Sequence, residues 1–234
     1  MKFNFQFSAK KLYESSSPVN GKMFVFEEDN RRRLAVGKFN YSLYANDRGD
    51  LLTDRYWGKL ALGIKKRKTG IDKILILGLG AGTFVHLFNH YFKPSVVDGI
   101  ELDPEVIKIG REFFYLSSAP NLNVYIADAC TWVYENQNTK ANYYDLIVFD
   151  LYKAVELPQE CEGRDFLTAT FRLLKNDGMV TFNRVCRRNE QDLIVKKFKE
   201  ENLAPFFQHI EQEDVKGALE FSNHIIYASL KKEL

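Results

Sequence analysis

Residues 74–77 are four consecutive apolar residues (Ile-Leu-Ile-Leu) that lead directly into a turn with glycine at positions 78, 80 and 82. An apolar run of this length without alternation is typical of a strand buried on both faces, as in the parallel sheets of α/β proteins. Glycine allows the turn to adopt positive φ angles and lets its backbone approach a ligand closely. Residues 83–88 are expected to form a helix whose free N–H groups point back at the turn. The pattern therefore predicts a strand, a ligand-binding turn and a helix, in that order.

A carboxylate follows at the distance where such a fold binds a ribose. Glu101 ends a second apolar run, residues 95–100, nineteen positions after Gly82. A carboxylate at the end of this strand is placed to accept hydrogen bonds from both ribose hydroxyls. The three glycines follow a G-x-G-x-G spacing rather than the G-x-G-x-x-G of dinucleotide sites. This spacing resembles the first motif of class I S-adenosylmethionine (AdoMet) methyltransferases, so an AdoMet-type cofactor is favoured over NAD.

From residue 71 onward, strand patterns alternate with helix patterns, which implies a mainly parallel sheet with right-handed crossovers. The last two apolar segments follow one another without a long helix between them, so we expect them to pair antiparallel at the sheet edge. The sequence thus predicts a Rossmann-like α/β fold of the class I methyltransferase type, with an antiparallel C-terminal hairpin. The further expected strands are residues 123–126, 145–149, 179–183, 206–210 and 223–230, and the expected helices are residues 104–115, 131–137, 164–174 and 191–200.

The first 50 residues show a different pattern. Residues 23–26 and 33–37 are short apolar segments on either side of a charged turn, which is typical of a β-hairpin. Residues 51–68 then carry apolar residues at near-helical spacing. We therefore expect a small N-terminal β appendage over residues 1–50 and a nucleoside-binding α/β domain over residues 51–234.

Acidic residues and the glycine turn all fall at the ends of predicted strands. Gly78 follows the first strand, Glu101 the second, Asp128 the third and Asp150 the fourth. Ligands of such sheets bind outside the carboxyl ends of the strands. These groups are therefore expected to share one site.

Composition excludes several classes of function. The 33 basic and 31 acidic residues nearly balance, which gives no electrostatic case for nucleic acid as a partner. No apolar run approaches the ~20 residues needed to span a bilayer, and the start of the chain lacks an apolar signal-peptide core. We therefore expect a cytoplasmic protein with no membrane partner that acts on a small molecule.

Cysteines and histidines show no metal-binding pattern. Cys130, Cys161 and Cys186 are odd in number and widely spaced, so neither a disulfide framework nor a zinc site is expected. His86 and His90 lie one helical turn apart on the first predicted helix of the α/β pattern, but no acidic third ligand accompanies them. The sequence predicts a reduced protein without a metal centre.

The chain resembles the polyamine aminopropyltransferases, the spermidine synthase family, over nearly its whole length. Ile76 stands two residues before the first glycine, where this family is apolar and ordinary methyltransferases usually carry an acid. Glu101-Leu102-Asp103 is similar to the family's E-I-D sequence. Residues 14–18 and 27–29 are similar to the entry of its N-terminal β domain.

The resemblance implies a role for the residues at the strand ends. Glu101 would bind the ribose hydroxyls, and Asp128 with Ala129 matches the G-D-G/A sequence whose acid accepts a hydrogen bond from the adenine amino group. Asp150 corresponds to the first acid of the D-S-S-D sequence, beside the reacting chain of the cofactor. For Asp128 and Asp150, capping of the following turn is the alternative. The complete set of predicted cofactor contacts is Gly78, Gly80, Ala81, Gly82, Glu101, Leu102, Asp128, Ala129 and Asp150.

Four departures from the family's pattern change the expected chemistry. Ala81 replaces the acid of the G-G-G-D-G turn, and Lys153 replaces the last acid of D-S-S-D. Residues 56–58 (Tyr-Trp-Gly) replace Y-H-E, and Asn40 stands where a glutamine is expected. Aminopropyl transfer needs carboxylates to hold a polycation and accept a proton. A unit charge ~4 Å away contributes about 4 kcal/mol at an effective dielectric constant near 20, so classical spermidine synthesis is not expected after these losses.

The same replacements favour AdoMet, which carries a carboxylate that decarboxylated AdoMet lacks. Ala81 removes a repulsion against that carboxylate, and Lys153 is expected to attract an anionic group of a substrate. The sequence therefore predicts an AdoMet-dependent methyltransferase, with Asp150 and Tyr152 as candidate catalytic or substrate-contacting residues. Transfer from a sulfonium needs alignment and exclusion of water more than a strong base.

Two alternatives remain open. One is an aminopropyltransferase that uses decarboxylated AdoMet and a different acid, Glu156 or Glu160. The other is a nucleoside-binding protein without catalysis. Residues 151–163 are long enough to act as a lid over the site, and a solvated disordered loop is the equal alternative. The family resemblance also implies a homodimer or a larger oligomer.

Overall fold

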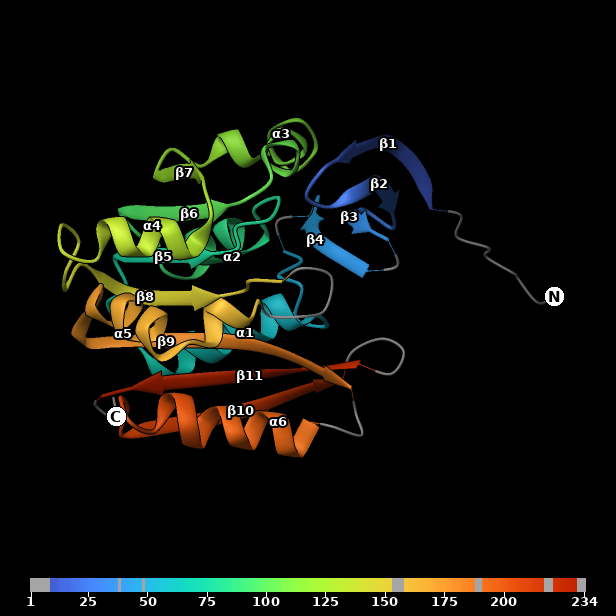
Figure 1. Cartoon of the computed structure of the whole chain (residues 1–234). Helices are drawn as coiled ribbons and strands as arrows, with labels where there is room; N and C mark the ends of the chain where they lie inside the picture. Colours follow the sequence, from blue (N-terminus) through green and yellow to red (C-terminus); the bar gives the residue numbers. More distant parts are fainter. Residues whose placement is uncertain are drawn as a thin grey trace.

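The computed structural model contains two β-sheets and describes most of the chain (Figure 1). The described residues are 9–37, 39–47, 49–152, 158–187, 191–216 and 221–230. The larger sheet has seven strands in the order β10-β11-β9-β8-β5-β6-β7, and the smaller has four in chain order.

The seven-stranded sheet confirms the predicted topology. The strands β5, β6, β7, β8 and β9 pair in parallel, and β11 joins β9 antiparallel, followed by β10 antiparallel to β11. This is a mainly parallel sheet finished by a C-terminal hairpin. The strand bounds are β5 Lys73–Leu77, β6 Val96–Glu101, β7 Leu122–Ile126, β8 Tyr144–Phe149, β9 Leu174–Arg187, β10 His209–Lys216 and β11 Phe221–Ser229.

Helices cover both faces of this sheet, which explains why its central strands are apolar throughout (Figure 1). Ile74 and Ile76 of β5 face helices α1 and α2, whereas Leu75 and Leu77 face helices α4, α5 and α6. The alternation follows from the two-residue period of a strand. The helix bounds are α1 Tyr56–Arg67, α2 Thr83–Tyr91, α3 Pro104–Phe113, α4 Ala129–Asn136, α5 Arg164–Arg172 and α6 Gln191–Lys197.

The N-terminal segment forms a four-stranded antiparallel sheet rather than a single hairpin. The predicted segments 23–26 and 33–37 correspond to the two middle strands, and two further strands extend them on both sides. The alternating Phe3, Phe5 and Phe7 lie outside the described residues. The strand bounds are β1 Lys10–Ser17, β2 Gly21–Glu28, β3 Arg31–Val36 and β4 Phe39–Ala45.

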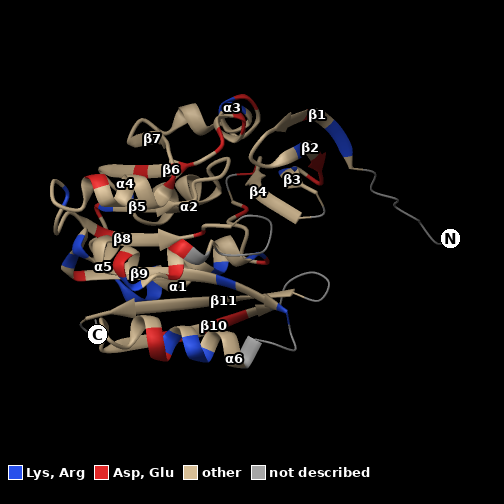
Figure 2. Cartoon of the chain, viewed as in Figure 1, with Lys and Arg blue, Asp and Glu red and all other residues tan. Residues whose placement is uncertain are grey.

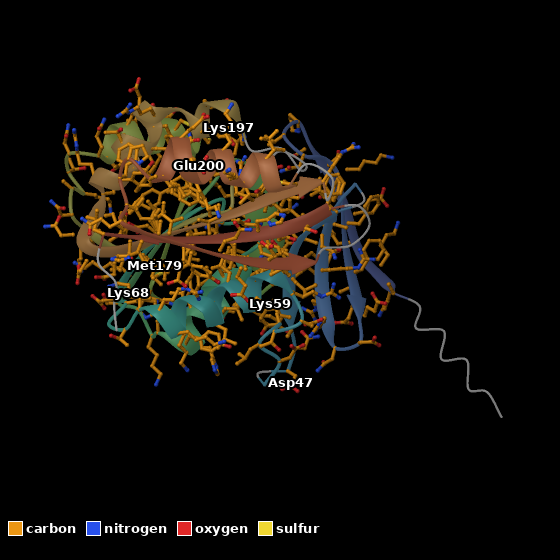
Figure 3. The ribbon with its side chains drawn as sticks, turned by 90° about the horizontal axis from the view of Figure 1, so that it is seen from below. Asp47, Lys59, Lys68, Met179, Lys197 and Glu200 are labelled. Atoms are coloured by element: carbon orange, nitrogen blue, oxygen red, sulfur yellow. The ribbon has the colours of Figure 1, made fainter. Side chains whose placement is uncertain are left out.

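This small sheet shares an apolar cluster with the α/β part of the chain. Met23 and Val25 of β2 pack with Ala81 of the glycine turn and with Val106 and Ile109 of α3. The small sheet therefore stands at the carboxyl ends of the parallel strands, whereas Lys68 and Met179 lie at the opposite end (Figure 3). The division of the chain at residue 50 remains a prediction.

Three elements differ in detail from the sequence prediction, and one is the strand expected at residues 206–210, which the structure has at His209–Lys216. Residues 176–178, between the expected helix 164–174 and the expected strand 179–183, lie inside the long strand β9. The pairing of β9 with β8 shifts register between Tyr144, which faces Leu174, and Leu146, which faces Met179. The extra residues form an irregularity in that strand. The last predicted helix continues from α6 into a π-helix, Phe198–Leu203. No helix of the described segments is both long and apolar enough to cross a membrane.

Candidate functional site

The glycine turn has the backbone conformation that its sequence predicts. Gly78, Gly80 and Gly82 have φ angles of +88°, +57° and +100°. A Cβ atom on Gly78 would lie 2.3 Å from the backbone oxygen of Asp150, and one on Gly80 would lie 2.7 Å from Ser42 Oγ. Glycine is therefore required both by the backbone angles and by close packing against β8 and β4.

Strand β4 is hydrogen-bonded to the glycine turn and to the first residue of α2, which the sequence did not predict. Ser42 Oγ accepts a hydrogen bond from Ala81 N at 2.8 Å, and Thr83 Oγ1 accepts one from Leu43 N at 2.9 Å. Ala81 is fully buried in the apolar cluster under the small sheet. The position at which the family pattern has an acid thus carries a buried methyl group here.

Glu101 connects the turn to the start of α3. Its Oε2 accepts a hydrogen bond from Gly80 N at 2.9 Å, and its Oε1 accepts one from Asp103 N at 3.0 Å. The side chain is buried, and this burial raises the pKa of Glu101. Leu102, a predicted cofactor contact, is half exposed beside it. The carboxylate therefore lies where the sequence placed it, and its binding of a ribose remains a prediction.

Asp103 ties the N-terminal sheet to the same place. Its Oδ1 accepts a hydrogen bond from Glu105 N at 2.9 Å, which caps α3 as expected. Its Oδ2 accepts a bond from Asn20 Nδ2 at 2.7 Å and another from Ser17 Oγ. The Asn20-Gly21 pair is a common hairpin-turn sequence, but nothing local shows that this turn contacts Asp103.

Tyr41 of β4 is another residue that sequence reasoning missed. It lies close to Glu101, Asp103 and Asp150, and burial together with these three carboxylates raises the pKa of its hydroxyl. Tyr41 therefore stays protonated and can donate a hydrogen bond at this edge of the sheet. No periodicity in residues 39–45 distinguishes it from a packing residue.

Asp128 and Ala129 begin helix α4. Asp128 Oδ1 accepts hydrogen bonds from Thr131 N at 2.9 Å and Thr131 Oγ1 at 3.1 Å, so the carboxylate is the N-cap of the helix. Both bonds use Oδ1, which leaves Oδ2 open to another donor. Asp128 is exposed and Ala129 is buried. Capping is thus a role of Asp128, and contact with adenine stays a prediction.

Asp150 lies directly beside the glycine turn and is held by two neutral donors. Its Oδ2 accepts a hydrogen bond from the hydroxyl of Tyr56 at 2.8 Å, and its Oδ1 accepts one from Asn183 Nδ2 at 2.9 Å. Asn183 is held in turn by Asn223, whose Nδ2 donates to Asn183 Oδ1 at 2.9 Å. Burial raises the pKa of Asp150 to about 6, and the two donors oppose this rise.

Tyr152 folds back onto β9. Its hydroxyl donates a hydrogen bond to Asn183 O and accepts one from Val185 N at 2.9 Å. Burial raises the pKa of the Tyr152 hydroxyl. The hydroxyl is therefore engaged on both sides, and a substrate contact by Tyr152 remains a prediction. Lys153 and Glu156 lie outside the described residues, as does the middle of the predicted lid.

Among the described residues, the histidine and cysteine candidates from the sequence do not form a metal centre. His86 Nε2 lies 2.7 Å from the carbonyl oxygen of Phe114, the residue that follows α3. Within the described part of the chain, no group of three or more His, Cys, Asp or Glu side chains is arranged to hold a metal ion. Basic and acidic residues follow one another along the chain, for example Lys196 and Lys197 of α6 and then Glu200 and Glu201 of the π-helix after it (Figure 2).

The fold and the strand-end geometry define a Rossmann-like protein of the class I methyltransferase type, with a small antiparallel sheet over the ligand-binding edge. The chain belongs to the spermine/spermidine synthase family, whose domain model matches residues 60–216. The resemblance seen in the sequence is thereby confirmed.

Curated relatives of this chain include two kinds of transferase. A polyamine aminopropyltransferase of Vibrio vulnificus is 30% identical over 112 residues, which cover 48% of this chain and 37% of the relative. The human eEF1A lysine and N-terminal methyltransferase is 26% identical over 168 residues, which cover 68% of this chain and 23% of the relative. The chain thus spans less than half the length of either relative.

Solved structures show the same fold. A spermidine synthase in complex with the transition-state analogue AdoDATO has a TM-score of 0.75 at 17% identity, covering 97% of this chain and 76% of the other. Human methyltransferase-like protein 13 in complex with SAH has a TM-score of 0.58 at 20% identity, covering 80% and 84%. Both structural neighbours hold AdoMet-type ligands.

Proposed function

We propose that this chain binds AdoMet and transfers its methyl group to a small-molecule acceptor. The observation that carries the proposal is Ala81, a buried methyl group at the position of the family's acid. An acid there would repel the carboxylate of AdoMet, whereas a methyl group does not. This difference favours AdoMet over decarboxylated AdoMet as the ligand.

The residues at the strand ends fit an AdoMet-type nucleoside. Glu101 presents both carboxylate oxygens, each held by one backbone N–H, and a carboxylate has further lone pairs for two ribose hydroxyls. Asp128 accepts its capping bonds on Oδ1, which keeps Oδ2 for the adenine amino group. When bound, the cofactor supplies a methyl group activated by a sulfonium.

Asp150 has two possible tasks in this site, and its environment supports both. With a pKa of about 6, its carboxyl is largely ionised at neutral pH. It can hold a cationic group, or accept the proton that an amine nucleophile loses. Tyr56 and Asn183 fix its orientation by hydrogen bonds to different oxygens. Alignment of the nucleophile and exclusion of water are the chain's main contributions to the rate.

Aminopropyl transfer is the second candidate. Membership of the spermine/spermidine synthase family and the retained acid Asp150 favour it. Ala81 opposes it, because the amine of decarboxylated AdoMet loses the carboxylate partner that the family pattern provides at this position. A nucleoside-binding protein without catalysis is the third candidate, since it needs only the residues that bind the ligand.

Calorimetric titration with AdoMet, decarboxylated AdoMet and methylthioadenosine separates these candidates. We expect AdoMet to bind most tightly, and turnover assays with amine and carboxylate acceptors then test catalysis. Tighter binding of decarboxylated AdoMet would contradict the proposal, and binding of AdoMet without any turnover would favour the third candidate.

Variants of two glutamates, Glu101 at the end of β6 and Glu112 in α3, test the site itself. Glu101→Gln keeps the shape of the side chain but offers only one acceptor oxygen, so we expect AdoMet affinity to fall at least about tenfold, equivalent to ~1.4 kcal/mol. Glu112→Gln removes an exposed charge from α3 and serves as the matched control. Equal affinities of the two variants would mean that Glu101 does not bind the ribose.

A further inference from the structure

Two cysteines that are far apart in the sequence lie side by side in the structure. The Sγ atoms of Cys130 and Cys161 are 3.6 Å apart, although 31 positions separate the residues. Cys130 is the second residue of α4, and Cys161 belongs to a short 3-10 helix, Gln159–Glu162, that ends the loop after β8. The odd number and wide spacing of the cysteines predicted no disulfide, and only the fold brings this pair together.

We propose that Cys130 and Cys161 are a redox modification site, at which a hydroperoxide converts the two thiols into a reversible intramolecular disulfide. This inference goes beyond the proposed function and does not depend on which nucleoside or acceptor the chain binds. Cys186, the third cysteine, is buried elsewhere on β9 and is not part of the site.

The geometry needs only a small adjustment. A disulfide has an S–S bond of about 2.05 Å, so the sulfurs must approach by roughly 1.5 Å in total. Cys161 lies on a short helical turn next to Pro158, rather than in the interior of a long element. A small displacement of this turn therefore closes the bond without disturbing the central sheet.

The oxidation of the two thiols to a disulfide takes two steps. The thiolate of Cys130, the more exposed of the two, attacks the hydroperoxide and becomes a sulfenic acid while an alcohol leaves. The Cys161 thiol then attacks the sulfenic sulfur, forms the S–S bond and releases water. In total, two thiols lose two electrons and two protons to the peroxide. A dithiol reductant reverses the reaction by exchange.

The surroundings of the pair make the reaction slow at neutral pH. Burial raises the pKa of both thiols, and the nearby carboxylates of Asp128 and Glu160 raise the two pKa values further. Only a small fraction of Cys130 is therefore a thiolate. The pair responds to sustained oxidation rather than to brief exposure, and the close partner protects Cys130 from irreversible over-oxidation.

The bond has a defined structural consequence. It fastens the 3-10 helix Gln159–Glu162, which lies within the predicted lid, to α4, beside Asp128 and Ala129 at the candidate site. The same 3-10 helix is already held on its other side, where Glu162 forms an ion pair with Arg184 of β9 and its carbonyl accepts a bond from Asn202. Oxidation therefore converts a turn held by polar contacts into one that is covalently fixed.

Peptide mapping after treatment with hydrogen peroxide tests the proposal on the full chain. We expect one cross-linked peptide pair that contains Cys130 and Cys161, lighter by the mass of two hydrogens, and restored by dithiothreitol. Cys186 should still be alkylated after denaturation. A disulfide that closes a loop of this length is expected to raise Tm by about 5–10 °C.

Matched serine variants complete the test. Cys186→Ser should keep both the cross-link and the shift in Tm, whereas Cys130→Ser and Cys161→Ser should each lose them. If one of the latter variants folds poorly, the wild-type map remains decisive on its own. Alkylation of both Cys130 and Cys161 after sustained peroxide treatment would overturn the proposal, as would a cross-link to Cys186, a link between two chains, or over-oxidised Cys130 without any cross-link.

Discussion

The carboxylate of Glu101 accepts a hydrogen bond from the backbone N–H of Gly80 at 2.9 Å. The acid predicted to bind a ligand thus also holds the turn predicted to bind it. Because a second oxygen of Glu101 bonds to Asp103 N, one side chain fixes the ends of two neighbouring strands. Pre-organised groups of this kind lose little freedom when a ligand binds.

Gly80→Ala tests the packing of the turn against β4. Gly80 has φ +57°, and an added Cβ would lie 2.7 Å from Ser42 Oγ, so strain and close contact act together. We expect a loss of about 2–3 kcal/mol in the free energy of unfolding, measured with urea. Gly70→Ala is the control, because Gly70 has φ +66° with no atom within 4 Å of the new Cβ. Equal losses of stability in the two variants would mean that the contact with Ser42 does not affect the stability.

Ser42→Ala removes the acceptor of the Ala81 N–H. The bond is buried, and an unpaired buried donor costs about 1–3 kcal/mol. We expect a loss of stability in this range and faster hydrogen exchange of the Ala81 amide. Ser95→Ala, at an exposed serine, should change the stability by less than about 0.5 kcal/mol. A stable variant with a protected Ala81 amide would show that another group replaces the serine.

The capping hydrogen bond of Asp128 can be tested separately from its predicted contact with adenine. Asp128→Asn keeps an oxygen for the Thr131 N–H but replaces the open Oδ2 by an amide donor. We expect unchanged stability within about 0.5 kcal/mol, together with an AdoMet affinity reduced about tenfold. Asp128→Ala should lose both the cap, about 1 kcal/mol, and the affinity. Full affinity of Asp128→Asn in calorimetry would exclude a hydrogen bond from the adenine amino group to this carboxylate.

The raised pKa of Asp150 makes stability depend on pH. Folding raises the pKa from 3.8 to about 6, so between these values the folded state binds more protons than the unfolded state. The contribution of Asp150 to the free energy of unfolding is therefore largest below pH ~4. It falls by about 2–3 kcal/mol in total as the pH rises through ~6.

The variant Tyr56→Phe tests this pH dependence, because the Tyr56 hydroxyl stabilises the ionised carboxylate of Asp150. Its removal should raise the pKa of Asp150 and shift the loss of stability to higher pH, as seen by urea unfolding between pH 4 and 8. Tyr134→Phe, at a half-exposed tyrosine, should follow the wild-type curve. Identical pH profiles of the two variants would mean that Tyr56 does not influence the titration of Asp150.

Local sequence patterns were sufficient to predict the seven-stranded sheet. Residues 74–77 read as a doubly buried strand, and Gly78, Gly80 and Gly82 read as a positive-φ turn, because both signals depend on neighbours along the chain. The N-terminal sheet was underestimated, since β1 is mostly polar and β4 carries a register shift. Residues 176–178 lie before the strand expected at 179–183 but are part of β9, because the shift in its pairing with β8 accommodates them.

The sequence by itself determined the order of strands and helices, the glycine turn and the carboxylates at the strand ends, since these follow from periodicity and spacing. The tertiary structure alone decided what contacts them: Ser42 on the turn, Asn20 on Asp103, Tyr56 and Asn183 on Asp150, and Cys161 beside Cys130. Each of these contacts joins residues more than 30 positions apart. Such pairs leave no trace in the local sequence pattern, because they form only when distant elements pack together: the small sheet, α1 and β9 around the candidate site, and α4 against the 3-10 helix Gln159–Glu162.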